Sequence, residues 1–241
     1  MTSNAWDAHA ANYQTKARLS TTDLHYGFDL PGEDQLHLVG DVRGKRVLEL
    51  GCGAGQNAIV LTKQGATVIG IDSSSAQLQL ARNLAEQQEV KVEFRQADMS
   101  DLAMIPADTI DFVLSVNALH YVEDLGRLLR QVDRVMKTSA PFVFSMRHPS
   151  WHLLGANGGD KIMLSYFAEG PVREVTDDGV ELVHYHHTFA TILTALRSAG
   201  LRVETLLEPQ APSGVPRTNM WQDGRDFVPR NLIIRARKDG R

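Results

Sequence analysis

The segment Val47-Leu48-Glu49-Leu50-Gly51-Cys52-Gly53-Ala54-Gly55 restricts what this chain can fold into more than any other stretch. It begins with the character of a buried strand, carries glycine at every second position from Gly51, and runs into residues 56–64, which have the pattern of a helix. A strand that turns sharply into a helix brings backbone N–H groups close to a ligand. We predict that Gly51 allows the sharp exit, that Gly53 makes room for a bound nucleoside, and that Gly55 lets the helix pack closely on the sheet.

A carboxylate follows the next predicted strand. Residues 67–71 have strand character, and Asp72 comes directly after them, 19 positions beyond Gly53. At this place a carboxylate can accept hydrogen bonds from both hydroxyls of a ribose. Asp72 could also cap a helix that begins among residues 73–75, and the two roles are compatible.

Strand and helix patterns alternate along the rest of the chain. Further strands are predicted at residues 91–95, 110–116, 139–147, 201–207 and 227–236. The clearest amphipathic helix pattern covers residues 125–136. This alternation predicts an α/β fold with a doubly wound, Rossmann-like sheet of about seven mostly parallel strands.

Four motifs in this order resemble those of the class I S-adenosylmethionine-dependent methyltransferases, in particular the UbiE-like small-molecule branch. They are residues 47–55, 69–73, 95–99 and 111–115, and the resemblance extends over about residues 6–238. It implies an antiparallel last strand inside the sheet, an N-terminal helical cap and an insertion after the fifth strand. We therefore expect a single methyltransferase domain over residues 1–241, divided into a cap (1–42), a cofactor-binding core (43–147), a substrate-rim insertion (148–187) and a C-terminal core (188–241).

The resemblance implies S-adenosylmethionine (SAM) as the cofactor, with S-adenosylhomocysteine as the product. The residues expected to bind it are Tyr13, Glu49, Gly51, Gly53, Gly55, Asp72, Ser73, Asp98, Met99 and Ser115. The ring of Tyr13 suits the methionine end, since a sulfonium is attracted to a π face. Asp98 can accept a bond from the adenine amine while Met99 packs on the ring, although Asp98 could instead be a turn residue. For Glu49, a structural role in the loop is as plausible as a contact with the cofactor.

The sequence gives weaker evidence for the residues that would bind or activate the methyl acceptor. His120, His187 and Tyr26 are candidate catalytic groups, and His120 could act as a base, orient the substrate or simply pack. Residues expected to contact the substrate are Trp151, Tyr166, Phe167 and His186. The histidines at 184, 186 and 187 lack an accompanying cysteine or an HExxH pattern, so no metal is predicted.

Composition narrows the function. A net charge of −4 gives no basic field for nucleic acid, and no apolar run is long enough to span a membrane. The single cysteine, Cys52, cannot form an internal disulfide, and we expect a cytoplasmic monomer or homodimer. Residues 115–121 lack the Asn/Asp-Pro-Pro-aromatic signature of enzymes that methylate adenine bases or glutamine amides.

The functional hypothesis is methyl transfer to an oxygen, nitrogen or carbon atom of a small molecule, such as an aromatic or indole-like metabolite. A nicotinamide-dependent oxidoreductase is one alternative, but it would favour GxGxxG over the GxGxG found here. A non-catalytic SAM-binding protein is the other.

Overall fold

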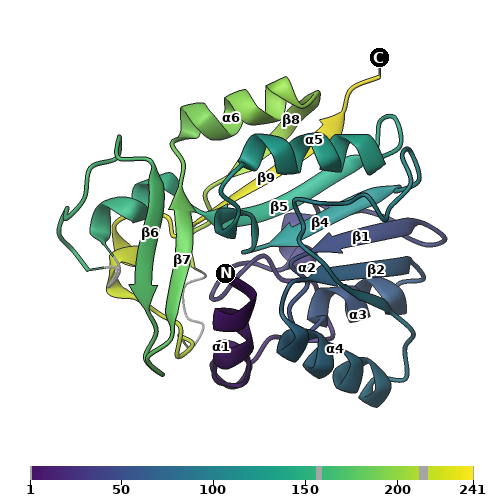
Figure 1. Cartoon of the computed structure of the whole chain (residues 1–241), viewed down its shortest axis with the longest axis horizontal. Coiled ribbons are helices and arrows are strands. Elements are labelled where there is room, and N and C mark those ends of the chain that lie inside the picture. The colour runs from purple at the N-terminus through teal and green to yellow at the C-terminus, as the bar shows by residue number, and fades with distance from the viewer. Residues whose placement is uncertain (1, 156–158, 212–216, 241) are drawn as a thin grey trace.

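A twisted sheet with strand order β3-β2-β1-β4-β5-β9-β8 forms the centre of the molecule (Figure 1). The computed structural model describes residues 2–155, 159–211 and 217–240. The strands of this sheet are β1 (Arg46–Leu50), β2 (Thr67–Asp72), β3 (Glu93–Gln96), β4 (Phe112–Val116), β5 (Pro141–Arg147), β8 (Leu201–Leu207) and β9 (Asn231–Lys238). All pairings from β3 to β5 are parallel, whereas β9 runs antiparallel between β5 and β8. The predicted seven-stranded doubly wound sheet with an antiparallel last strand inside it is confirmed.

The last strand shows the largest difference from the predicted strand boundaries. The last strand begins at Asn231, not at residue 227, and a short 3-10 helix, η3 (Asp223–Asp226), precedes it. Pro229 has no N–H to give to a neighbouring strand, which is why a strand in the sheet interior cannot include it.

Helices cover both faces of the sheet (Figure 1). On one face, Leu48 and Leu50 of β1 pack in a core that includes α5 (Leu125–Val135) and α6 (Phe189–Ser198). On the other face, Val47 packs against α3 (Gln56–Lys63), next to which lies α4 (Ser75–Gln87). Alternate residues of a strand point to opposite faces, so both layers are specified by the same five residues of β1.

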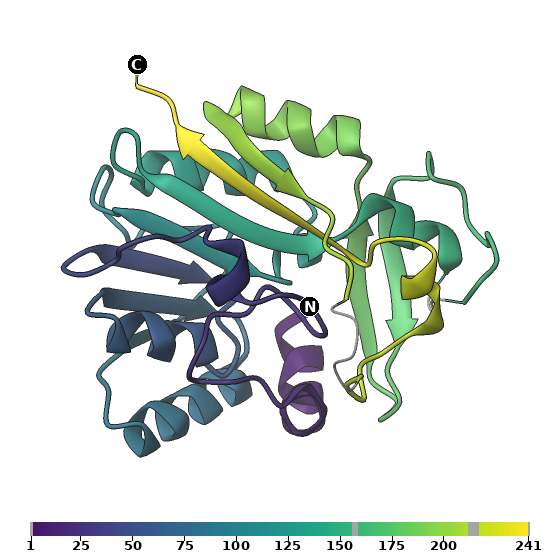
Figure 2. The ribbon, with the colours of Figure 1, turned by 180° about the vertical axis from the view of Figure 1, so that it is seen from behind.

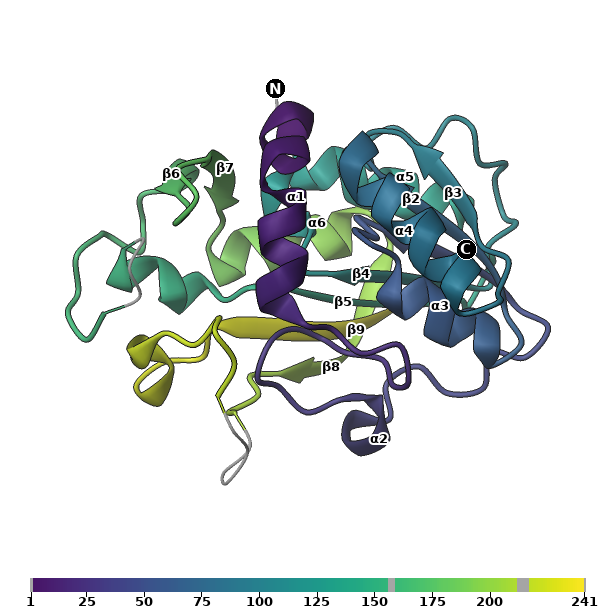
Figure 3. The same ribbon diagram turned by 90° about the horizontal axis from the view of Figure 1, so that it is seen from below.

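Two elements lie outside this layered core. The strands β6 (Gly170–Val175) and β7 (Glu181–His186) form an antiparallel hairpin beyond the end of the sheet, as Figure 2 shows from behind. The helix α1 (Thr2–Ala17) lies between this hairpin and α4 (Figure 3). The remaining helical pieces are α2 (Glu33–Leu36), η1 (Leu119–Tyr121) and η2 (Pro149–Leu154). Together α1 and the hairpin cover the carboxyl ends of the parallel strands, the edge where open α/β sheets bind ligands.

Candidate functional site

The glycine turn after β1 forms one wall of a cavity of about 480 Å³. At Gly51, φ is +64°, and a Cβ would lie 2.2 Å from the Cβ of Ala118 in the loop after β4. Gly53 is different, because the nearest atom to a Cβ there would be Gln77 Oε1, 3.8 Å away. Gly51 is therefore required by packing between strand ends, whereas Gly53 leaves open space at the cavity wall.

Asp72 connects the turn to the cavity. Its Oδ2 accepts a hydrogen bond from the Gly53 N–H at 2.8 Å, and its Oδ1 accepts one from the Ser74 N–H at 2.9 Å. Burial raises the pKa of Asp72, and the N–H groups of Ser74 and Gly53 act in the opposite direction. Each carboxylate oxygen can accept more than one hydrogen bond, so Asp72 can hold the turn and still accept hydroxyl donors from a ligand. The adjacent Ser73 lines the cavity as well.

Asp98 and Met99, which follow β3, also line this cavity. Asp98 Oδ1 accepts bonds from both the N–H and the hydroxyl of Ser100, each at 2.8 Å. The turn role left open by the sequence is therefore present, and the residue also lines the cavity.

An aromatic cluster closes one end of the cavity. Trp6 and Tyr13 of α1 meet edge to face with ring centroids 5.2 Å apart, and Tyr121 packs on Trp6 at 5.3 Å. Burial is the main cause that raises the pKa of Tyr13 and takes that of Tyr121 to about 12. Both phenols therefore stay protonated and can donate hydrogen bonds.

Three of the residues predicted to bind cofactor do not line the cavity. Glu49 is buried beneath the turn, where its Oε2 has no hydrogen-bond partner among the described residues and burial raises the pKa of the carboxyl to about 8. A Cβ at Gly55 would lie 2.7 Å from the ring of Phe94, so this glycine serves helix packing. Ser115 is fully buried and donates to the Leu50 carbonyl, which joins β4 to β1. These positions support the turn from behind.

A second cavity, of about 110 Å³, adjoins the first. Both are lined by Trp6, Tyr13, Asn117 and Tyr121. The second cavity is lined also by His9, Phe28, His120, Arg147, Glu174, Thr176, Leu182, Met220, Arg230 and Asn231. It lies where β4 and β5 end and β9 begins, so it is the neighbouring place for a second ligand.

His120 lines this second cavity, but its surroundings disfavour the role of a base. Its Nδ1 accepts the Arg147 N–H at 3.4 Å, which places the proton of the neutral ring on Nε2. Burial and the nearby charge of Arg147 hold the pKa of His120 well below its usual range. The ring is therefore neutral, with a donor at Nε2, and is poorly suited to accept a substrate proton.

The other predicted catalytic groups lie away from both cavities. Tyr26 is completely buried in the core on the α3 side of the sheet and donates its hydroxyl to Glu33, so it is a structural residue. His187 borders a void of about 10 Å³, too small for a substrate, and burial lowers its pKa. The sequence indicates which side chains can take up or release protons, but it does not show where those side chains point.

The predicted substrate wall residues also lie outside the cavities. Trp151 is buried in the core, and Phe167 is 85% exposed. The Tyr166 hydroxyl accepts the Phe189 N–H at 3.0 Å, at the start of α6. His186 stacks on His152 with centroids 3.9 Å apart and bonds the Tyr166 carbonyl at 2.8 Å. Tyr166 and His186 thus form contacts at the base of the hairpin, while the hairpin residues that line the cavities are Glu174, Thr176, Leu182 and Tyr185.

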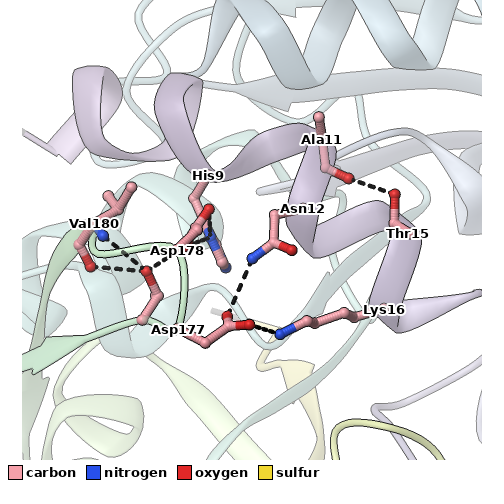
Figure 4. A network of polar contacts seen from close by, with 9 residues as sticks. His9, Ala11, Asn12, Thr15, Lys16, Asp177, Asp178 and Val180 are labelled. Carbon is pink, nitrogen blue, oxygen red and sulfur yellow. Dashed lines mark hydrogen bonds and ion pairs between the residues drawn. The ribbon is translucent and has the colours of Figure 1, made fainter.

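Polar contacts fasten α1 to the turn of the β6–β7 hairpin (Figure 4). His9 Nδ1 lies 2.9 Å from Asp178 Oδ1, Asn12 Nδ2 donates to Asp177 Oδ1 at 3.1 Å, and Lys16 pairs with Asp177. The pKa of Asp178 is lowered to about 2, first by the Thr176 hydroxyl and then by His9. Segments that are more than 160 residues apart in the sequence thus form one cover over the cavities.

No cluster of three or more His, Cys, Asp or Glu residues within the described ranges is placed to hold a metal ion. No helix in the described part of the chain is long and apolar enough to cross a membrane.

Comparison with known proteins agrees with this architecture. A family model described as a methyltransferase domain matches residues 48–144. A ubiquinone biosynthesis O-methyltransferase from Acinetobacter baylyi is 32% identical over 127 residues, which make up 52% of this chain and 53% of that relative. The chain thus spans about half the length of the curated relatives it matches in this way.

Similarity to solved structures extends further. A proposed SAM-dependent methyltransferase from Listeria monocytogenes aligns with a TM-score of 0.73 and 26% identity, covering 86% of this chain and 96% of its own. A SAM-dependent methyltransferase from Mesorhizobium loti aligns with a TM-score of 0.69 and 27% identity, covering 84% and 94%. The similarity therefore includes the C-terminal half, which the family model does not reach.

Proposed function

Because the chain belongs to the class I SAM-dependent methyltransferases, we propose that it transfers a methyl group from SAM to a small-molecule acceptor. The observation that carries this proposal is the pairing of Gly53 with Asp72. An open, side-chain-free bend and a carboxylate that still has accepting capacity face the same cavity. This combination suits a nucleoside whose ribose donates two hydroxyls.

The residues around the large cavity fit such a ligand. Gly53 and Asp72 would hold the ribose, Asp98 and Met99 would contact the adenine, and Tyr13 would face the sulfonium end. The volume of about 480 Å³ lies within the range of small-ligand sites. Glu49, Gly55 and Ser115 would act indirectly by keeping the turn in place.

When bound, SAM supplies an electrophilic methyl carbon attached to an excellent leaving group, so that the protein mainly has to position the acceptor. Trp6, Tyr13 and Tyr121 stand between the two cavities and exclude water from that boundary. The acceptor would occupy the second cavity, with its nucleophilic atom toward this aromatic cluster. His120 would orient the acceptor as a hydrogen-bond donor and would not remove its proton.

An oxygen acceptor is supported by the similarity to O-methyltransferases, whereas amine and carbon nucleophiles remain compatible with a site in which His120 does not act as a base. A nicotinamide-dependent oxidoreductase is not favoured, because the motifs and the structural relatives agree on methyl transfer. A binding protein without catalysis would be separated from an enzyme by turnover of radiolabelled SAM with phenols, indoles and amines.

Thermal denaturation with SAM, S-adenosylhomocysteine, NAD and NADP tests the cofactor. At a hundredfold excess over Kd, a ligand adds about 2.7 kcal/mol, which raises Tm by roughly 5–10 °C in a domain of this size. We expect this rise with SAM and S-adenosylhomocysteine only. Stabilisation by the nicotinamides alone would overturn the proposal.

Gly53→Ala, with Gly44→Ala as its control, tests the site of binding. Both glycines have positive φ, +54° at Gly53 and +71° at Gly44. An added Cβ would have no neighbour closer than 3.8 Å at Gly53 and none within 4 Å at Gly44. The two variants should lose similar stability, about 1 kcal/mol. Only Gly53→Ala should reduce the SAM-dependent rise in Tm, because its methyl group would project into the nucleoside site.

A further inference from the structure

Two arginines that the cofactor does not require line the second cavity. Arg147 ends β5 and Arg230 directly precedes β9. These strands are antiparallel neighbours in which Arg147 is paired with Asn231, so the sheet brings both guanidinium groups to the same end. The placement follows from the strand pairing, although the residues are 83 positions apart in the sequence.

The charges around this cavity do not balance. Arg147 donates to Glu174 Oε2 at 2.8 Å, which neutralises one cation. Arg230 donates to the Met220 carbonyl at 3.1 Å and lies over the rings of Phe28 and Trp151, at 6.0 and 5.8 Å from their centroids. Within the described ranges it makes no ion pair with a carboxylate. A guanidinium in this position carries a desolvation cost that an anion would offset.

Glu174 is the carboxylate that acts on the charge of Arg230, and it is already paired with Arg147. Asp29 is paired with Arg225 at 3.1 Å, and Asp178 is held by His9. Burial, together with Arg225 and Arg147, lowers the pKa of Arg230 to about 9, so the group is still a cation at neutral pH. Among the described residues that line this cavity, two arginines thus face one carboxylate, that of Glu174.

The junction of the two cavities supplies further hydrogen-bond donors. Asn117 lines both cavities and has φ +53°, an uncommon conformation for a residue other than glycine. Its Oδ1 accepts a bond from Asn231 Nδ2 at 2.5 Å, which leaves its own Nδ2 to act as a donor. Local strain of this kind often marks a functional position.

We propose that the second cavity binds a carboxylate group of the methyl acceptor, with Arg230 as its main partner and Asn117 as a supporting donor. The inference rests on the proposed function, since it names the acceptor class of that site: a small hydroxy acid or aromatic acid. A planar guanidinium holds a carboxylate through two parallel hydrogen bonds, and this fixes the direction of the rest of the molecule. The acid group would lie at the Arg230 end, and the nucleophilic atom would point past Tyr13 toward the larger cavity.

Paired acids and amides test the proposal. Calorimetry on the protein saturated with S-adenosylhomocysteine would compare 4-hydroxybenzoate with 4-hydroxybenzamide, and indole-3-acetate with indole-3-acetamide. The members of each pair share shape and differ in charge. We expect at least tenfold tighter binding of the acid in at least one pair. Equal affinities in both pairs, or no binding by either acid, would overturn the proposal without any variant being needed.

Arg230→Met should remove the preference for the acid, and Arg230→Lys should retain part of it. Arg217→Met is the matched control, because Arg217 lies over the ring of Trp221 in the same C-terminal region but lines neither cavity. Circular dichroism and Tm would establish that the variants fold. A tenfold preference that persists in folded Arg230→Met would refute the role of Arg230.

The two proposals fail in different ways. Affinity for S-adenosylhomocysteine should change less than twofold in Arg230→Met, since this residue does not line the larger cavity, which we call the nucleoside cavity. If S-adenosylhomocysteine does not bind the unaltered protein, the proposed function is wrong, and the acid and amide pairs measured without nucleoside still decide on the anion site. If S-adenosylhomocysteine binds but the acids do not bind more tightly than the amides, only the proposed carboxylate site at Arg230 is refuted.

Discussion

The two cavities differ in how the chain builds them. Most of the nucleoside cavity comes from the continuous part of the sequence between Gly51 and Arg127, with α1 and Tyr185 added at its edge. The second cavity is assembled from α1, Phe28, the loop after β4, the end of β5, the hairpin and residues 220–231. The first is thus organised mainly by local turns, and the second exists only when distant segments meet. This suggests that binding of the common cofactor and choice of acceptor can change independently.

The largest expected effect on stability concerns Glu49, which lies beneath the glycine turn of the nucleoside cavity. Burial raises its pKa from 4.5 to about 8, so between these values the folded state keeps a proton that the unfolded state has released. Stability should therefore fall as pH rises, by up to about 1.4 kcal/mol per pH unit. Glu49→Gln should remove this slope and be several kcal/mol more stable than the parent at pH 8.

Urea denaturation between pH 5 and pH 8 would measure the effect of Glu49→Gln. Parallel stability profiles for the two proteins would show that the carboxyl does not hold its proton. The acid preference of the second cavity should be the same in both proteins if the two regions are independent.

Gly51→Ala should cost about 2–4 kcal/mol of folding free energy. The added methyl would meet Ala118 at 2.2 Å, and the positive φ adds strain, so the ends of β1 and β4 would have to move apart. Gly44→Ala has the same kind of backbone but open space around it and should cost only about 1 kcal/mol. Equal costs in urea titration would show that the contact with Ala118 is relieved without loss of stability and that only the backbone conformation disfavours alanine at position 51.

Asp72→Ala should weaken binding of SAM by about 1–3 kcal/mol, since ribose hydroxyls and the Gly53 N–H would lose their acceptor. Asp101→Ala is the control, because Asp101 is exposed and lies outside the cavity lining. Titration calorimetry would give both affinities. Unchanged binding in Asp72→Ala would mean that the ribose lies elsewhere.

The contact between α1 and the hairpin should give the smallest effect. Lys16 and Asp177 are 32% and 58% exposed, and exposed pairs typically contribute about 0.2–1 kcal/mol. A double-mutant cycle with Lys16→Ala and Asp177→Ala should return a coupling in this range that shrinks in high salt. A coupling above about 2 kcal/mol would mean that this ion pair holds α1 to the hairpin more strongly than an exposed pair does.

The same contrast explains what the sequence allowed us to predict. The alternation of strands and helices follows from periodicity, whereas the position of the last strand and the cluster of Gly51, Gly53, Asp72, Asp98 and Met99 were implied by the resemblance of the motifs, each of which lies at the end of its own strand. Tyr13 was also expected near this site, because the resemblance places an aromatic residue of the N-terminal helix at the methionine end of the cofactor. The structure places these residues around one cavity, and their contacts with a cofactor remain predictions.

The acceptor side could not be predicted in the same way. Tyr26 and Trp151 have suitable chemistry, but burial in the core decided their positions. The sequence offers one indication that Arg147 and Arg230 are functional, since each is a charged residue next to an apolar strand. Their shared location depends on β9 pairing antiparallel with β5, and that pairing determines which ends of the two strands coincide.

The position of β9 also has a consequence for biosynthesis. β8 joins the sheet only through β9, which is made after it and must insert between two strands already present. Until residues 231–238 leave the ribosome, β5 and β8 expose unpaired backbone edges that can associate with other chains. The nascent chain would therefore be prone to association until residues 231–238 are synthesised, and a delay in their translation would prolong the exposure of these edges.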